Sequence, residues 1–325
     1  MNPQLLEIKD LQTHFFTRSG VAKAVNGVSF TLGERETMGI VGESGSGKTI
    51  TAMSVMRLIP NPPGRIVGGS ILYKGIDLVT MPETDMRNIR GNQISMIFQD
   101  PMTSLNPVLT VGFQIAEVLF IHRRKTKKEA MQRAVEMLQQ VGIPEPEKRA
   151  RNYPHQLSGG MRQRAMIAMA LACNPSLLIA DEPTTALDVT IQAQILDLMQ
   201  KLQEKTGTAI IMITHDLGVV AELCRKVLVM YAGEPAEQGS VEDIFNNPCH
   251  PYTRGLLTSM PNLDTDEKVK LTPIDGVPPD LKNLPLGCNF AARCQQANDQ
   301  CRTFKPPALQ VKPGHTVACH LFANA

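Results

Sequence analysis

A phosphate-binding loop constrains this chain more than any other feature of its sequence. Residues 42–49 read GESGSGKT and fit the pattern G-x-x-x-x-G-K-[ST]. An apolar run, 38–41, precedes them and a second apolar stretch, 50–58, follows, so we expect a loop between a buried strand and a helix. Glycines let backbone N–H groups turn toward phosphate oxygens, and the helix start adds partial positive charge. The predicted phosphate site is Gly42, Glu43, Ser44, Gly45, Ser46, Gly47, Lys48 and Thr49.

Two side chains of this phosphate loop have specific predicted roles. The Lys48 ammonium would reach the β- and γ-phosphates, and the Thr49 hydroxyl would take one place on Mg²⁺. The plain alternative is a glycine-rich turn that only joins two elements. Eight matching positions in a strand-to-helix setting argue against that alternative.

Length and charge exclude several classes of protein. With 325 residues, the chain is long enough for two or three structural units. Its 33 basic and 31 acidic residues leave a net charge of +2, which gives no electrostatic reason to expect nucleic-acid binding. No apolar run approaches the roughly 18 residues that cross a bilayer. The first residues, MNPQLLEIKD, lack the features of a signal peptide. We therefore expect a cytoplasmic protein that meets membranes through a partner.

The hydrophobic pattern predicts an α/β domain with a helical insert. Residues 5–32 alternate apolar and polar, with turn signals at Ser19-Gly20 and Asn26-Gly27, and predict antiparallel strands. Short strands are expected at 70–73 and 94–98, and Gln99 follows the second. From 110 to 171 the period is helical, and residues 126–129 form a capping box. Phe15 or Phe16 could stack on an adenine ring, with core packing as the alternative for each.

Polar side chains follow two further predicted strands. The strand 177–180 leads to Asp181 and Glu182, where one carboxylate can hold Mg²⁺ through water and the other can orient an attacking water. The strand 209–214 leads to His215. Surface exposure is the alternative for the two acids. A lone histidine is more often a satisfied polar residue than a catalytic one.

A second glycine motif, LSGGMRQR at residues 157–164, completes a resemblance to a known family. The chain resembles the ATP-binding cassette (ABC) ATPases. The motifs occur in the family's order: the phosphate loop, Gln99, the 157–164 signature, Asp181-Glu182, Ala186-Leu187-Asp188 and His215. The resemblance implies an α/β cassette with a mixed sheet core, an antiparallel β-subdomain and a helical subdomain at about 104–172.

The resemblance also implies roles for individual residues. Glu182 looks like the general base, His215 the sensor of the γ-phosphate, and Gln99 the link between Mg²⁺ and the helical insert. Thr49, Gln99 and Asp181 would hold Mg²⁺, and Phe15 would contact adenine. Ser158 is expected to cap a helix and, with Gly159 and Gly160, to bind the γ-phosphate of ATP held by another cassette. Met161 stands where the family usually has glutamine.

Residues 96–107 and 250–254 narrow the resemblance to importers of dipeptides, oligopeptides and nickel. The chain is most similar to the D-type ATPase subunit of a dipeptide permease. Such a subunit pairs with an F-type ATPase beneath two permeases, fed by a periplasmic binding protein, at the cytoplasmic face of the bacterial inner membrane. The alternatives are a nickel or oligopeptide importer, a soluble cassette ATPase that acts on DNA or the ribosome, and an adaptor with an inert ATP site.

The end of the chain has a different composition. We expect an ATPase domain at 1–260, a proline-rich linker at 261–287 and a cysteine-rich extension at 288–325. Four clustered thiols in a reducing compartment suggest a metal, and their loose spacing suits an iron–sulfur cluster better than zinc. Peptide-importer ATPases that the chain resembles carry such a [4Fe–4S] cluster. Zinc and unligated thiols are the alternatives. The candidate ligands are Cys288, Cys294, Cys301 and Cys319.

Overall fold

The computed structural model describes residues 4–100, 104–185, 187–259 and 274–323. The chain divides into two compact units. Within the described residues, the first unit comprises 33–36 and 80–212, and the second comprises 4–32, 37–79 and 213–323. No helix in these ranges is both long and apolar enough to span a bilayer. Parts of two predicted motifs, residues 101–103 and Ala186, lie outside the described residues, as do Pro261 and Pro273 of the predicted linker.

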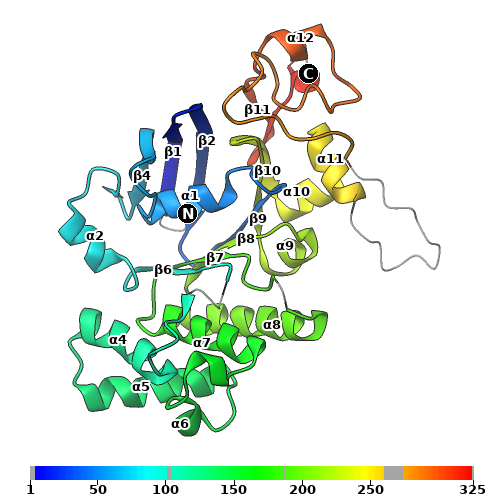
Figure 1. The fold of residues 1–325 in the computed structure, drawn as a ribbon. Coiled ribbons are helices and arrows are strands. Elements are labelled where there is room, and N and C mark those ends of the chain that lie inside the picture. The colour runs from blue at the N-terminus through cyan, green and yellow to red at the C-terminus, as the bar shows by residue number, and fades with distance from the viewer. Residues whose placement is uncertain (1–3, 101–103, 186, 260–273, 324–325) are drawn as a thin grey trace, which may run out of the picture. The chain divides into compact units, whose positions relative to one another are not determined.

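The first unit contains the predicted helical insert. Helices α4, α5 and α7 pack against one another (Figure 1), and strand β6 pairs in parallel with β7, which has β8 on its other side. The elements are α2 (Glu83–Ile89), β6 (Ile94–Ile97), α4 (Val111–Arg123), α5 (Lys127–Gln140), α6 (Pro146–Arg149), a 3₁₀ turn (Pro154–Gln156), α7 (Gly159–Leu171), β7 (Leu177–Asp181), α8 (Val189–Thr206) and β8 (Ala209–Ile213).

Local sequence explains how α5 begins and which face it buries. The Thr126 hydroxyl accepts a hydrogen bond from the Glu129 backbone N–H, and the Glu129 carboxylate accepts one from the Thr126 N–H. This confirms the predicted capping box. Ala130, Ala134 and Leu138, spaced by four residues, are fully buried as their period indicates.

The second unit holds the phosphate loop and the C-terminal residues. One sheet has the order β2-β1-β4-β5, and a second set of strands runs β11-β12-β10-β9-β3. Strand β3 pairs in parallel with β9, whereas β9, β10, β12 and β11 pair antiparallel. The strands are β1 (Gln4–Thr17), β2 (Gly20–Gly33), β3 (Thr37–Val41), β4 (Gly64–Tyr73), β5 (Ile76–Asp77), β9 (Lys226–Tyr231), β10 (Glu234–Ser240), β11 (Ala308–Lys312) and β12 (His315–Ala318). The helices are α1 (Lys48–Val55), α9 (Leu217–Leu223), α10 (Val241–Asn246), α11 (Pro251–Thr258), α12 (Asp299–Thr303) and a 3₁₀ turn (His320–Phe322).

Three predictions about element boundaries were wrong. The predicted turn at Asn26-Gly27 is absent, because β2 runs through it and Gly27 adopts a φ of 84° within the strand. Strand β4 starts at Gly64 rather than at residue 70, since β1 pairs with it as far as the Phe15–Gly64 pair. Helix α1 is Lys48–Val55 rather than 50–58, and it ends just before Arg57, whose φ is 49°.

The described part of the predicted linker, residues 274–287, contains no helix or strand. The residues after it are tied to the sheet of the second unit, because β12 pairs with β10 through Glu237–Val317 and Gln238–Thr316. Figure 1 shows α12 and β11 together at the end of the chain. The four cysteines thus belong to a segment whose last strands extend the run of strands that includes β10, β9 and β3.

Candidate functional site

The phosphate loop joins β3 to α1, as predicted, and two of its glycines occupy positions where a Cβ would clash with backbone oxygens. Gly42, Gly45 and Gly47 have φ values of 149°, 76° and 101°. A Cβ on Gly42 would lie 2.2 Å from a backbone oxygen, and one on Gly47 would lie 2.4 Å from another. Both contacts are far inside van der Waals distance, so the sharp curl of the loop requires glycine.

The polar groups of the loop suit a phosphate chain. Lys48 is 5% exposed, and its ammonium donates to the carbonyl oxygens of Gly42 at 2.7 Å and Glu43 at 2.9 Å. The Ser46 hydroxyl is buried and has no hydrogen-bond partner among the described residues. Thr49 is exposed in the first turn of α1. A buried hydroxyl without a partner is costly unless an anion or water satisfies it.

Two predicted catalytic residues meet in the first unit. Strand β7 ends at Asp181, which is 2% exposed, and Glu182 follows with a left-handed φ of 46°. One Glu182 carboxylate oxygen accepts hydrogen bonds from the Gln99 amide and from the Thr185 hydroxyl, both at 2.9 Å. A strained backbone conformation at a non-glycine residue is typical of functional sites. The structure therefore brings together Gln99, which follows β6, and Glu182, which follows β7.

The signature residues begin helix α7 in an open position. The Ser158 hydroxyl caps the helix by accepting a hydrogen bond from the Met161 N–H at 3.3 Å, which confirms the predicted cap. Ser158 and Gly159 are exposed. A Cβ on Gly159 would meet nothing within 4 Å, whereas one on Gly160 would lie 3.0 Å from Ile191. Within the first unit, the start of α7 is therefore accessible at Ser158 and Gly159.

The remaining predicted contacts with the nucleotide lie in the second unit. His215 is exposed and directly precedes Asp216, which caps α9. The Phe15 ring covers Gly64, because a Cβ on that glycine would lie 2.7 Å from a ring carbon. Phe16 is 40% exposed, and the Arg65 guanidinium lies 4.2 Å from its ring centroid. Phe16 thus already stacks with a cation, and Phe15 stays the predicted adenine contact.

Comparison with known proteins identifies the family. Residues 25–185 match the ABC transporter family, and residues 236–301 match the oligopeptide/dipeptide transporter C-terminal region. The oligopeptide transport ATP-binding protein AppD of Bacillus subtilis is 56% identical over 318 residues, with coverage of 98% of this chain and 97% of that protein. The chain belongs to the ABC transporter family. It is an ATPase cassette, and ATP hydrolysis coupled to transport is the activity of this family.

Other relatives and a solved structure agree with this result. The dipeptide transport ATP-binding protein DppD of B. subtilis is 54% identical, over 98% of this chain and 95% of that protein. A dimeric structure of the cassette MJ0796 bound to ADP and phosphate covers 73% of this chain and 98% of its own, at 28% identity and a TM-score of 0.66. The predicted cassette fold, with mixed and antiparallel sheets and helices, is confirmed.

The four cysteines of the C-terminal segment surround one cavity of the second unit. Cys288, Cys294, Cys301 and Cys319 all line it. Burial, together with smaller contributions from the three neighbouring cysteines, raises the pKa of the Cys288 thiol to about 11. The His320 ring lines the same cavity, and its Nδ1 atom is buried without a hydrogen-bond partner among the described residues. Thiols that converge in this way repel one another as thiolates, and a bound metal would relieve that repulsion.

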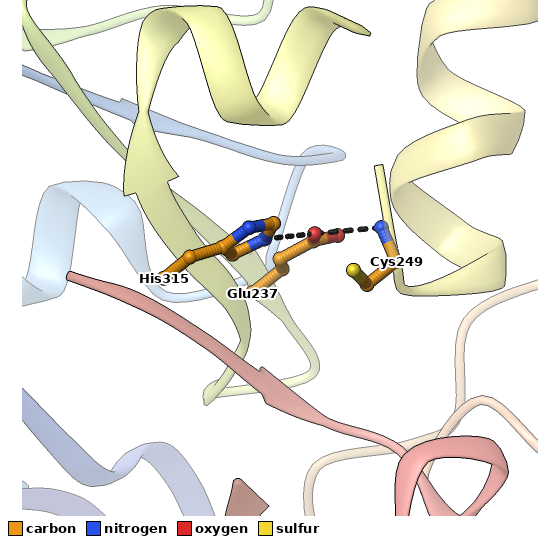
Figure 2. A group of neighbouring side chains, drawn as sticks. All are labelled: Glu237, Cys249 and His315. Atoms are coloured by element: carbon orange, nitrogen blue, oxygen red, sulfur yellow. Dashed lines mark hydrogen bonds and ion pairs between the residues drawn. The ribbon is translucent and has the colours of Figure 1, made fainter. Parts of the chain in front are cut away.

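A second group of potential metal ligands forms structural hydrogen bonds. Glu237, Cys249 and His315 place ligand atoms within 4.8 Å of one another. Both Glu237 oxygens already accept hydrogen bonds, from the Cys249 N–H and the His315 ring at 2.7 Å each and from the His250 N–H at 2.9 Å. Figure 2 shows the ring and the Cys249 nitrogen on either side of the carboxylate. The carboxylate therefore fastens β12 and the start of α11 to β10.

Sequence reasoning missed two residues that contact the phosphate loop. Tyr252, part of the 250–254 motif, and Arg293, which no motif marks, both hydrogen-bond to Glu43. The motif drew attention to Tyr252 without indicating its partner. Only the folded chain shows that these residues reach the loop.

Proposed function

We propose that this chain is the ATPase subunit that powers peptide uptake, with dipeptides as the cargo. The match of residues 236–301 to the oligopeptide/dipeptide transporter C-terminal region carries the proposal, because that region is described for peptide transporters. The dipeptide transport protein DppD of B. subtilis supports the choice of dipeptides. AppD and OppD, named as oligopeptide transport proteins, support the alternative of longer peptides.

In this proposal the chain works as one half of a pair at the cytoplasmic face of the membrane. A homologous F-type ATPase is the partner cassette, and both sit beneath two permease subunits that a periplasmic binding protein supplies. The phosphate loop and Lys48 hold the ATP phosphates, and Phe15 contacts the adenine. Thr49, Gln99 and Asp181 hold Mg²⁺. The open start of α7, at Ser158, Gly159 and Gly160, receives the γ-phosphate of the partner's ATP.

Glu182 would then act as the general base for the attacking water. The hydrogen bonds from Gln99 and Thr185 fix the position of its carboxylate. His215, exposed at the carboxyl end of β8, would contact the γ-phosphate and report its loss. Gln99 would pass the resulting movement to the helical insert and on to the permeases.

Uptake by whole cells tests the proposed cargo. A strain that lacks the gene should fail to accumulate a labelled dipeptide, and the wild-type gene should restore uptake. The same strain should take up a labelled pentapeptide and nickel ions at normal rates. If dipeptide uptake stays normal and pentapeptide or nickel uptake is lost, the chain belongs to one of the alternative importers. If uptake of all three is unchanged, the result contradicts an import function.

We further propose that the four cysteines bind an iron–sulfur cluster of the [4Fe–4S] type, with zinc as the alternative. Cys288, Cys294, Cys301 and Cys319 would be its ligands, and the cluster would fasten the turns that carry them. Tetrahedral zinc with Zn–S bonds near 2.3 Å would hold its sulfur atoms about 3.8 Å apart. Among the described residues, no three of these sulfur atoms lie within 4.8 Å of one another. The loose spacing of the four cysteines along the sequence favours a group with several metal atoms.

Iron content distinguishes these alternatives. Protein purified without oxygen should be brown and should contain about four iron atoms per chain. Cys294→Ser should lose the colour and most of the iron, whereas the matched change Cys224→Ser, at a buried thiol outside this group, should keep both. Colourless protein with stoichiometric zinc would favour the zinc site, and protein with neither metal would contradict metal binding.

A further inference from the structure

The second residue of the phosphate loop is held by side chains from far along the chain. The Glu43 backbone N–H donates to the Tyr252 hydroxyl at 2.8 Å. The two Glu43 carboxylate oxygens accept from the two terminal nitrogens of Arg293, at 2.7 and 2.9 Å. All three residues belong to the second unit. The cysteine-rich segment therefore contacts the phosphate loop directly.

The Arg293 guanidinium is held in this position by several further hydrogen bonds. Besides the two bonds to Glu43, it donates to the Tyr231 hydroxyl at 3.3 Å and to the carbonyl oxygens of Ile274 at 3.0 Å and Asp275 at 2.8 Å. These five bonds use all five of its N–H groups. The side chain is 5% exposed, and the Phe290 ring centroid lies 5.8 Å from its central carbon. Lysine cannot reproduce this planar fork.

The backbone of Arg293 lies in the turn between two of the clustered cysteines. The Arg293 N–H donates to the Phe290 carbonyl at 3.0 Å, and the next residue, Cys294, donates to Ala291. The Cys288 N–H donates to the Cys301 carbonyl oxygen at 2.7 Å, which joins the start of this turn to α12. A change in the conformation of this turn would therefore act on the contact between the Arg293 guanidinium and Glu43.

The contact also has electrostatic consequences for ATP. Lys48 uses the Gly42 and Glu43 carbonyl oxygens as its acceptors, so the Glu43 peptide helps to place the ammonium. A carboxylate on a loop that binds a triphosphate repels its ligand unless a cation neutralises it. Arg293 supplies that cation through a bidentate pair of low exposure, where screening by salt is weak.

We propose that Arg293 is a positioning residue for ATP binding. It holds and neutralises Glu43, and in this way it makes the affinity of the phosphate loop depend on the conformation of the cysteine-bearing turn. The proposal goes beyond the importer function and the cluster, because the contact exists whether or not the cysteines bind a metal. Nucleotide binding by the full-length chain tests it.

Titration with a fluorescent ATP analogue, trinitrophenyl-ATP, gives the dissociation constant. Arg293→Ala should weaken binding about tenfold, since it leaves a carboxylate unpaired on the loop. At saturating ATP, kcat should change by no more than about twofold, so the effect should fall on KM. Arg302→Ala removes an exposed guanidinium from α12 in the same segment and should bind the analogue as wild type does.

A double variant separates positioning from general damage. In Arg293→Ala/Glu43→Gln the repelling charge is gone, so the dissociation constant should return to within about threefold of wild type. Arg293→Lys keeps the positive charge without the planar set of N–H donors, so its dissociation constant should be intermediate. If Arg293→Ala loses its native circular dichroism, Arg293→Lys takes its place in the comparison. Wild-type affinity in the Arg293 variant, or a double variant that binds no better than Arg293→Ala, would overturn the proposal.

Discussion

Glu182→Gln should abolish ATP turnover and leave ATP binding intact. Glutamine keeps the size of the side chain and can still bond to Gln99 and Thr185, which meet one carboxylate oxygen in the wild type. It cannot accept the proton of the attacking water. A general base contributes roughly 10²–10⁴ to the rate, so kcat should fall by about that factor. Phosphate release at saturating ATP and titration with the fluorescent analogue measure the two quantities.

The matched control for this change is Glu204→Gln. Glu204 is an exposed glutamate of the same unit, on α8, and contacts Gln200 one turn earlier. It should keep wild-type turnover. A Glu182→Gln variant that retains more than about a tenth of the activity would show that another group takes the proton.

Gly159→Asp should stop hydrolysis by blocking the second half of the nucleotide site. Gly159 is the first residue of α7, and the space around its missing Cβ is open. An acid in the first turn favours the helix by about 0.3–1 kcal/mol, so the fold should not suffer. The same charge repels a γ-phosphate, and losing such donors costs about 10²–10³ in rate. When this chain is prepared alone and pairs with a second copy of itself, both nucleotide sites of the pair carry the Gly159→Asp substitution.

The comparison with Gly159→Asn shows whether charge is the cause. Asparagine has the shape of aspartate without its charge, so it should retain most of the turnover that the acid removes. Analogue binding by the unpaired chain should be the same in both variants, since the phosphate loop lies in the other unit. Equal loss in the two variants would indicate a steric effect, and no loss in either would contradict a phosphate site at α7.

Features that depend on neighbours in the sequence were predictable. The phosphate loop, the capping box at Thr126 and the cap at Ser158 each need a few residues at fixed spacing, and all three occur as expected. The turn predicted at Asn26-Gly27 failed for a different reason. The pairing of a long strand outweighs the local preference of that dipeptide, and a glycine with positive φ lets the strand continue.

Long-range contacts left no local signal. Gln99 and Glu182 are 83 residues apart, and Glu43 and Arg293 are 250 apart. Neither pair shows a period or motif that links its members. The cysteines were an intermediate case, because their chemistry suggested a common site, whereas only the fold showed that they line one cavity. Contacts of this kind come from topology rather than from propensity.

The pairing of β12 with β10 has a consequence for biosynthesis. Until the last strands of the described chain emerge from the ribosome, β10 presents a row of unpaired backbone groups, which invites pairing with another nascent chain. Two prolines, Pro306 and Pro307, precede β11, and the exposed Lys312 ends it, so the finished edge resists such pairing. A chain released early, before residue 315, would therefore be prone to aggregation even though its phosphate loop is already complete.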